Sequence, residues 1–269
     1  MRIVILFFIL NCTALLGQNV SGVVISEKDK SPVGFVNIGI AGKNIGTVSD
    51  FNGKFNLLLD AQFDNDTLLF SCIGYNPFSI KISELKKDNN KNIFLKEKAY
   101  EMKEIVIRPK NFKQRTLGVT SHSKMVEAGF KDNLLGYECG ILMETKKSAE
   151  LERVNINIAQ CTYDSIFYRL NIYRVRGKMN FENILTTPIY INISKDQVKE
   201  KITIDLQSQN IIVDGDFLVT LENVKNLGNG NLYFCSGIMD KTYFRKTSQA
   251  VWETIPVGIS ISVDAKVEK

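Results

Sequence analysis

The stretch "GTVSDFNGKF", residues 46–55, places two glycines, an aspartate and an asparagine between runs of alternating apolar and polar residues. Such a loop is either a site for a metal ion or phosphate, or the turn between two β-strands. Asn-Gly is the strongest short signal for a hairpin turn, because both residues tolerate positive φ. Asp50 would cap the turn by accepting backbone N–H groups. Gly46, Asp50, Asn52 and Gly53 therefore predict a hairpin in an all-β fold.

The two alternatives for this loop fail on spacing. A calcium loop of the EF-hand type needs oxygen ligands at alternate positions and a glutamate at its twelfth position, but leucines occupy residues 57–59. A phosphate loop leads into a helix, and this loop leads into the strand-like run "KFNLLL". We predict no metal, cofactor or catalytic group here.

Outside this loop, short runs rich in Val, Ile, Phe and Tyr alternate with turn residues from Val20 to the end. No long amphipathic helical pattern interrupts them, which favours β sandwiches over an α/β fold. Period-two runs such as "LERVNINIA" and "SIFYRLNIYRV" are typical of half-buried strands. In the second run, Ile166, Tyr168, Leu170 and Ile172 share one face. The predicted fold class is all-β, with a transthyretin- or Ig-like sandwich followed by a jelly-roll-like sandwich.

The predicted domain boundaries follow composition. Residues 1–17 have Arg2, an apolar run too short for a membrane span and a small residue before Gln18, as in a cleaved signal peptide. Lipidation at Cys12 is disfavoured, because Asn11 precedes it. The first sandwich is predicted at 18–97 and the second at 120–269. The charged segment 98–119 is a predicted linker with one short strand, and no membrane span is expected after signal cleavage.

The first sandwich also resembles a known family. Gly22, Val23 and Pro32, then "GTVSDFNGKF", then Ile73-Gly74-Tyr75 occur in the order found in the carboxypeptidase-like regulatory domain. That transthyretin-like module is similar to the N-terminal extension of many TonB-dependent outer-membrane receptors. The resemblance covers residues 19–96 and gives Gly74 and Tyr75 a structural role. It implies export, to the periplasm, outer membrane or surface of a Gram-negative cell.

The composition limits what chemistry is expected. A metallocarboxypeptidase needs two histidines and a carboxylate as zinc ligands, and this chain has one histidine, His122. The net charge of +5 is spread along the chain, whereas nucleic-acid binding calls for a basic patch. Neither a carboxypeptidase nor a nucleic-acid partner is therefore expected. Cys72, Cys139, Cys161 and Cys235 have no CxxC spacing, and their sequence context fits either two disulfides or buried thiols.

Aromatic and basic residues give the best indication of binding. "FYRLNIYR" and "KTYFRKTSQAVW" bring Tyr168, Tyr243 and Trp252 near Arg169 and Arg245 in sequence. Tyr, Trp and Arg are enriched at binding hot spots, and aromatic rings stack on sugars. The competing interpretation is that the rings face the core while the arginines cover the outer face.

Three functional hypotheses remain from the sequence. The first is a non-catalytic exported envelope protein that binds an unknown protein or glycan. The second is a glycan-directed hydrolase, for which Asp164, Asp205 and Glu222 would have to converge as paired carboxylates. The third is a structural protein in which "EIVIR", within residues 101–110, adds a strand to a partner's sheet.

Overall fold

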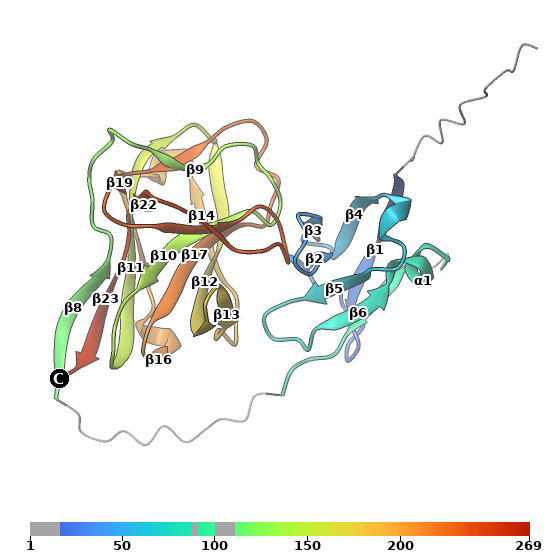
Figure 1. Cartoon of the computed structure of the whole chain (residues 1–269), viewed down its shortest axis with the longest axis horizontal. Helices are drawn as coiled ribbons and strands as arrows, with labels where there is room; N and C mark the ends of the chain where they lie inside the picture. The colour runs from blue at the N-terminus through green and yellow to red at the C-terminus, as the bar shows by residue number, and fades with distance from the viewer. Residues whose placement is uncertain (1–16, 88–90, 100–110) are drawn as a thin grey trace, which may run out of the picture.

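The structure is a computed structural model, and it describes residues 17–87, 91–99 and 111–269. Almost every regular element is a β-strand, and the α-helix of the described residues is a single six-residue segment, α1 (Ile82–Lys87). The strands form two separate groups of sheets (Figure 1). The prediction of an all-β chain built from two sandwiches is therefore confirmed.

The first domain packs two small sheets face to face. The first sheet has the order β4-β1-β7 and the second has the order β3-β2-β5-β6. Their bounds are β1 (Gln18–Ser26), β2 (Asn37–Ile40), β3 (Gly46–Val48), β4 (Lys54–Leu59), β5 (Thr67–Ser71), β6 (Phe78–Lys81) and β7 (Asn92–Leu95), and a 3-10 turn, η1, spans Ala61–Phe63. Alternate residues of β4 are buried, because a strand turns successive side chains to opposite faces. Val24, Ile38, Leu59 and Phe70 are among the residues that fill the core between the sheets.

The turn at Asp50 is present, but the strands beside it do not form a hairpin. Asp50 Oδ1 accepts hydrogen bonds from the backbone N–H groups of Asn52 and Lys54, each at 2.8 Å. Gly53 adopts φ +72°, in the left-handed region that favours glycine. However, β3 pairs with β2 and β4 pairs with β1. The hairpin prediction is thus wrong, because the turn carries the chain from one sheet to the other.

The second domain is a larger sandwich with strands of up to 14 residues. One sheet has the order β13-β12-β17-β10-β20-β21, with β14 also on β12, and the facing sheet has the order β8-β23-β11-β18-β9, with β15 and β16 also on β11. The bounds in the first sheet are β10 (Glu138–Met143), β12 (Ser165–Gly177), β13 (Asn180–Asn183), β14 (Ile189–Ser194), β17 (Phe217–Asn223), β20 (Thr242–Arg245) and β21 (Glu253–Ile255). The bounds in the facing sheet are β8 (Phe112–Gly118), β9 (Ala128–Phe130), β11 (Ser148–Cys161), β15 (Lys201–Asp205), β16 (Ile212–Asp214), β18 (Leu232–Phe234) and β23 (Ile261–Glu268). A short ribbon pairs β19 (Ser236–Gly237) with β22 (Gly258–Ile259), and 3-10 turns lie at η2 (Lys195–Gln197) and η3 (Gln207–Gln209).

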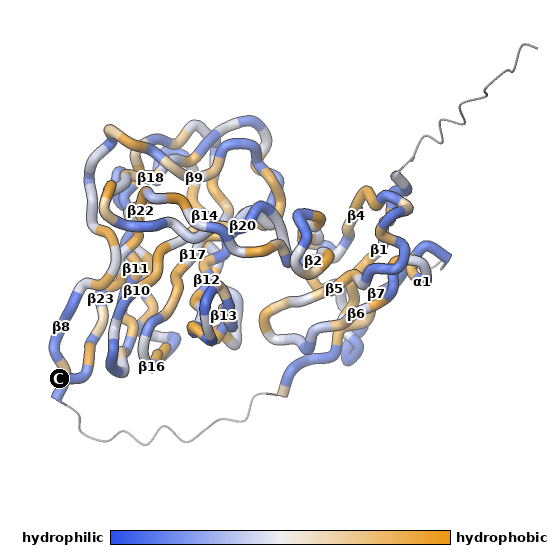
Figure 2. Tube along the Cα trace, viewed as in Figure 1, coloured by the Kyte–Doolittle hydropathy of each residue, from blue (hydrophilic) through white to orange (hydrophobic). Residues whose placement is uncertain are grey.

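The core of the second domain lies between these two sheets. Ile166, Tyr168, Leu170 and Ile172 of β12 all belong to it, as the period of two predicts. Figure 2 shows hydrophobic and hydrophilic residues following one another along the strands of both domains. The strand β8 falls within the predicted linker 98–119, but it pairs with β23 along its whole length and so forms part of this sandwich. The short strand predicted in the linker, at "EIVIR" within residues 101–110, lies outside the described residues.

Two further features bear on the sequence analysis. Cys72, Cys139, Cys161 and Cys235 are free thiols, two of them buried, so of the two sequence interpretations the structure shows the unpaired one. Across the described parts of the chain, no helix has the length and apolar character needed to cross a membrane.

Candidate functional site between the two domains

A row of charged residues crosses the outer face of the first sheet of the second domain. The strand registers place Arg169 of β12 opposite Glu222 of β17, Glu222 opposite Glu138 of β10, and Glu138 opposite Arg245 of β20. Cross-strand neighbours on one face lie close enough to interact directly. The sequence therefore builds an Arg-Glu-Glu-Arg row from four strands that are far apart along the chain.

This row is buried. Both glutamates have no exposed surface, and Arg169 and Arg245 are 2% and 8% exposed. These residues alternate with the inward residues of the same strands, so they point away from the sandwich core. At the Arg169 end of the row, the first domain covers this outer face.

Arg169 ties the two domains together. Its Nη2 donates to Glu222 Oε2 at 2.7 Å and to Asn37 Oδ1 of the first domain at 2.6 Å, and its Nη1 donates to the carbonyl oxygen of Phe35 at 2.7 Å. Phe35 adopts φ +57°, which non-glycine residues seldom do. Burial by itself would lower the pKa of Arg169, but Glu222 holds that pKa above its ordinary value. The guanidinium thus remains charged at the domain interface.

Glu138 sits at the other end of the row. Its Oε2 accepts a hydrogen bond from Nε of Arg245 at 2.7 Å, and Nη2 of Arg245 lies 2.6 Å from the same oxygen in an ion pair. Its Oε1 accepts from Tyr173 at 2.9 Å and from the hydroxyl of Thr220. Asn171 joins the two carboxylates, because its Nδ2 donates to Glu138 at 2.9 Å and to Glu222 at 2.8 Å.

The two carboxylates differ in their proton affinity. Burial raises the pKa of Glu138, and the pull of Arg245 toward lower values does not cancel it because Glu222 pushes the same way as burial. Burial acts upward on Glu222 too, but Arg169 and Arg245 together hold the pKa of Glu222 below its ordinary value. Oε1 of Glu222 has no hydrogen-bond partner among the described residues, and Arg245 Nη2 lies 3.8 Å from it.

A polar pocket of about 270 Å³ opens above this row, between the two domains. The second domain contributes its arginines together with amide and aromatic side chains from β12, β13 and the segment after β20. The first domain contributes the start of β2, the end of β5 and the loop that follows β5. The lining residues are Asn37, Ser71, Cys72, Ile73, Tyr75, Lys98, Arg169, Asn171, Tyr173, Phe181, Asn183, Leu185, Arg245 and Gln249. The predicted motif residue Tyr75 thus forms part of a wall. The hydrogen bond from Asn183 Nδ2 to Asn171 Oδ1 at 3.0 Å fixes the amides in place.

An aromatic cluster stands beside this pocket. The Trp252 ring makes edge contacts with Phe181 and Tyr173, at centroid distances of 5.3 and 5.8 Å, and Phe181 contacts Tyr243 at 5.7 Å. The guanidinium carbon of Arg245 lies 5.1 Å from the Trp252 ring centroid, within cation–π range. The pocket therefore combines rings, amides and a guanidinium.

Two glycines of the first domain allow the second domain to contact it closely. Gly39 of β2 and Gly46 of β3 are register partners, and a Cβ on either would lie 2.4 Å from the carbonyl oxygen of Ser248. Next to this contact, Gln249 accepts a bond from the N–H of Gly42 at 2.9 Å, and its Nε2 donates to Ser71 Oγ at 2.7 Å. Only residues without a side chain allow this approach, so Gly46 has an interdomain role that the turn prediction did not include.

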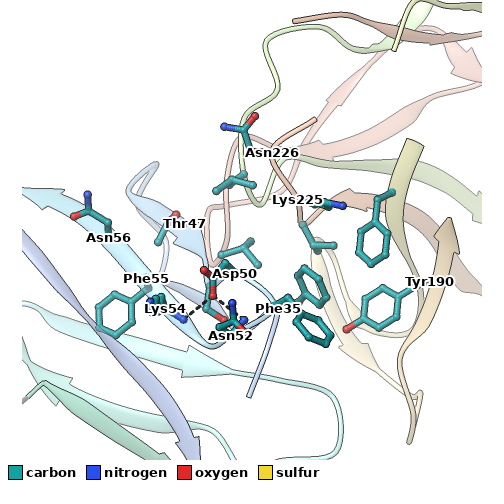
Figure 3. Close-up of a pocket in the computed structure, with 16 residues that line it drawn as sticks. Phe35, Thr47, Asp50, Asn52, Lys54, Phe55, Asn56, Tyr190, Lys225 and Asn226 are labelled. Carbon is teal, nitrogen blue, oxygen red and sulfur yellow. Dashed lines mark hydrogen bonds between the residues drawn. The ribbon is translucent and has the colours of Figure 1, made fainter. Parts of the chain in front are cut away.

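A second, apolar groove of about 790 Å³ lies between the same domains. Phe35 packs at centroid distances of 5.1 Å from Phe167 and 5.3 Å from Tyr190. Figure 3 shows Phe35 and Tyr190 turned toward one another, with Asp50 bonded within its own turn and Lys225 above the rings. Phe51, which also lines this groove, is 75% exposed.

The predicted binding residues separate into two groups. Arg169, Tyr243, Arg245 and Trp252 lie on the outer face, and they meet at or beside the polar pocket. Tyr168 is 1% exposed and packs on Phe130 at 4.3 Å between centroids. It faces the core and does not present its ring to a ligand, so its prediction as a binding residue is wrong.

The three acidic residues proposed for hydrolysis do not lie together in one site. Asp164 is exposed in the turn between β11 and β12, and Asp205 is exposed at the end of β15 in the facing sheet. Glu222 is buried in the other sheet, and its opposed carboxylate is Glu138, which sequence reasoning did not consider. His122 is exposed in the connection between β8 and β9. Within the described residues, no group of His, Cys, Asp and Glu side chains is arranged to hold a metal ion.

Sequence reasoning also missed Asn171, Phe181 and Asn183. The alternate residues Arg169, Asn171 and Tyr173, opposite the apolar face of the same strand, are the signal that would have indicated a covered polar surface. The partners of that surface depend on strand register, which is not visible in one strand.

Residues 20–107 match the family model of the CarboxypepD_reg-like domain, which confirms the predicted resemblance. A comparison with curated proteins gave no match. Among solved structures, a mutant VP2 protein of infectious bursal disease virus in T=1 particles is 8% identical, with 87% of this chain and 59% of that chain covered and a TM-score of 0.19. The VP2 subviral particle of the same virus is 10% identical, with coverages of 87% and 61% and a TM-score of 0.18. This chain spans about three fifths of the length of these two proteins, and the likeness carries no argument at such scores.

Proposed function

From the premise that residues 20–107 form a CarboxypepD_reg-like domain, which belongs to a non-catalytic family, we propose that this chain is an exported cell-envelope protein that binds a ligand. In this proposal the regulatory-like domain and the second sandwich act as one binding unit. The support for export is the signal-like pattern of residues 1–17. Residues 1–16 of that pattern lie outside the described residues.

One observation carries the binding proposal: the polar pocket takes its walls from both domains and is lined by rings, amides and arginines. Ligand sites prefer domain interfaces and combine apolar surface with a few polar groups that fix orientation. Rings such as Tyr173 and Phe181 offer flat surfaces to a sugar, and Asn183 and Gln249 offer hydrogen bonds to its hydroxyl groups. A glycan is therefore the favoured ligand, and an envelope protein is the alternative.

Binding is tested with the chain 18–269, screened on a glycan array and against immobilised polysaccharide fractions of the cell envelope. We expect saturable binding that Phe181→Ala weakens by about tenfold, since stacked aromatic contacts contribute about 1–1.5 kcal/mol. The matched control is Phe94→Ala, which removes an exposed ring of β7 that does not line the pocket. Equal loss in both variants, or no binding by the parent chain, would contradict the proposal.

The hydrolase hypothesis finds no support in the geometry. Paired glycosidase carboxylates flank an open groove, about 5–9.5 Å apart, whereas Glu138 and Glu222 have no exposed surface and are hydrogen-bonded to fixed neighbours. Incubation of the pure chain with the glycans it binds should leave them uncleaved. Release of reducing ends that is lost in one acidic variant would restore the enzyme hypothesis.

The protein-partner alternative rests on the apolar groove. If a protein is the ligand, Phe51→Ser should weaken its binding more than Phe181→Ala does, because Phe51 lines the groove and is largely exposed. Strand addition by residues 101–110 remains a separate proposal, since this segment lies outside the described residues. Its test is deletion of 101–110, which should abolish a complex while both domains stay folded.

A further inference from the structure

The charges that reach the polar pocket are all of one sign. Lys98, Arg169 and Arg245 line it, and none of its lining residues in the described chain is an aspartate or glutamate. The two carboxylates that balance the arginines, Glu138 and Glu222, are fully buried and do not line the pocket. A ligand in the pocket therefore meets the cations, while the compensating anions lie beneath them.

Of the two arginines, Arg245 is the one with a nitrogen that can still donate a hydrogen bond to a ligand. Arg169 uses all three of its nitrogens on Glu222, Asn37 and Phe35. Arg245 uses Nε and Nη2 on Glu138, with a longer contact from Nη2 to Tyr173 at 3.4 Å. Its Nη1 makes no hydrogen bond to any residue that the structure describes. A guanidinium donor is a strong partner for a carboxylate, because charge-assisted hydrogen bonds are about twice as strong as neutral ones.

The remaining walls suit a sugar ring more than a flat apolar molecule. Tyr173 and Phe181 supply aromatic surface. The side-chain Nε2 of Gln249 donates to Ser71, and its amide oxygen accepts no hydrogen bond from the described residues. A volume of about 270 Å³ lies just below the range of roughly 300–1,000 Å³ typical of small-molecule sites. One ring with its substituents fits such a space, and an extended polymer would have to reach it by an end.

We infer that the polar pocket holds a uronic acid, a sugar ring that carries a carboxylate, with that carboxylate at Arg245. This inference rests on the proposed glycan-binding function and specifies its ligand. The same chemistry is presented by a free sugar acid and by the end of an acidic polysaccharide. In both cases the neutral counterpart, which has a hydroxymethyl group in place of the carboxylate, binds less tightly.

The test is isothermal titration of the chain 18–269 with two matched probes, methyl β-D-glucopyranosiduronic acid and methyl β-D-glucopyranoside. We expect the acid to bind about tenfold tighter or more, because hydrogen bonds to charged groups are about twice as strong as neutral ones. A third arm uses an oligosaccharide with the uronic acid at its non-reducing end. Tighter binding of the oligosaccharide identifies a polysaccharide end as the source, and equal binding identifies the single sugar.

Removing Arg245 alone would leave Glu138 buried without its cation and could unfold the site. The double variant Arg245→Met with Glu138→Gln removes the cation and its partner together. Its matched control is Lys246→Met with Glu253→Gln, because Lys246 and Glu253 form an ion pair at 3.2 Å that is half exposed and does not line the pocket. The first double variant should lose the preference for the acid, and the second should keep it.

Several outcomes would overturn the inference. They are equal affinity for acid and neutral sugar, a preference that survives Arg245→Met with Glu138→Gln, and no binding of either probe. If envelope glycans still bind in the Phe181-dependent way while these outcomes occur, the proposed function stands and only the uronic acid fails. If nothing from the envelope binds, both fail.

Discussion

The two faces of β12 are both buried, but against different neighbours. Ile166, Tyr168, Leu170 and Ile172 pack into the core of their own sandwich. The alternate residues Arg169, Asn171 and Tyr173 are buried as well, yet they form a hydrogen-bonded network with two glutamates and, through Arg169, with the first domain. One face holds a domain together and the other joins two domains.

This difference has an energetic meaning. Apolar burial stabilises a fold roughly in proportion to the area removed from water. A buried ion pair contributes little net stability, because desolvation offsets attraction, but removal of one partner leaves a charge that nothing compensates. The polar face therefore specifies which surfaces meet. Replacing one partner of an ion pair there should lower stability more than replacing both partners together.

The largest effect is expected from Arg169→Met. It should lower the free energy of unfolding by about 3–5 kcal/mol, since Glu222 then loses its closest cation in a buried site. Urea unfolding followed by the fluorescence of Trp252, the chain's single tryptophan, measures it. Arg176→Met, which breaks a half-exposed pair with Glu182, should change stability by about 0.5 kcal/mol or less. A loss below about 1 kcal/mol for Arg169→Met would contradict this view of the polar face.

Leu170→Ala tests the other face of the same strand. It should cost about 3 kcal/mol through lost burial and a cavity, in the range of the first variant but with a different local pattern. Hydrogen exchange separates the two, because Arg169→Met should speed exchange at Phe35–Asn37 of the first domain before global unfolding, and Leu170→Ala should not. Identical exchange patterns would remove the distinction between the faces.

Gly46→Ala tests the close contact between Gly46 of the first domain and Ser248 of the second. The new Cβ would meet the Ser248 carbonyl oxygen at 2.4 Å, so the second domain must shift, at a cost of about 1–3 kcal/mol. Limited proteolysis should then cut near residues 246–250 faster than in the parent chain. Asn44→Ala, at an exposed position of the same β2–β3 connection, is the control and should leave the cutting rate unchanged.

The smallest effect concerns pH and separates the two glutamates. Glu222 has a lowered pKa, so its contribution to stability is present above the unfolded value of about 4.3 and is lost as pH falls through the folded value. Glu138 has a raised pKa, so its contribution is present below about 4.3 and is lost as pH rises through the folded value. Glu222→Gln should therefore cost more stability at pH 7 than at pH 4, and Glu138→Gln should cost less at pH 7 than at pH 4. Parallel behaviour of the two variants in urea unfolding at both pH values would refute the assignment.

Parts of this comparison were predictable from the sequence. The alternation in "SIFYRLNIYRV" placed Ile166, Leu170 and Ile172 on one buried face, because the period of two is local to the strand. The turn at Asp50 was also predictable, since Asp50 bonds to residues two and four positions away. The pairing of β3 and β4 with other strands was not, because it depends on contacts between distant segments.

The site shows the same limit more sharply. Arg169, Tyr243, Arg245 and Trp252 were singled out by residue type, but their partners were not. Glu138 stands beside Glu222 only through the register of β10 on β17. The prediction of Tyr168 as a binding residue was wrong for a local reason. The period of two places Tyr168 on the same face as Ile166 and Leu170, which is the core face, and the choice of binding residues by type ignored this.

The most direct test of the central claim, that the two domains share one ligand site on the polar face, is an NMR titration of the chain 18–269 with methyl β-D-glucopyranosiduronic acid. The account predicts saturable shifts of backbone amides in both domains, at Ser71–Ile73 and at Asn171–Tyr173, with one common affinity. Shifts confined to one domain, or no shifts at either segment, would contradict it.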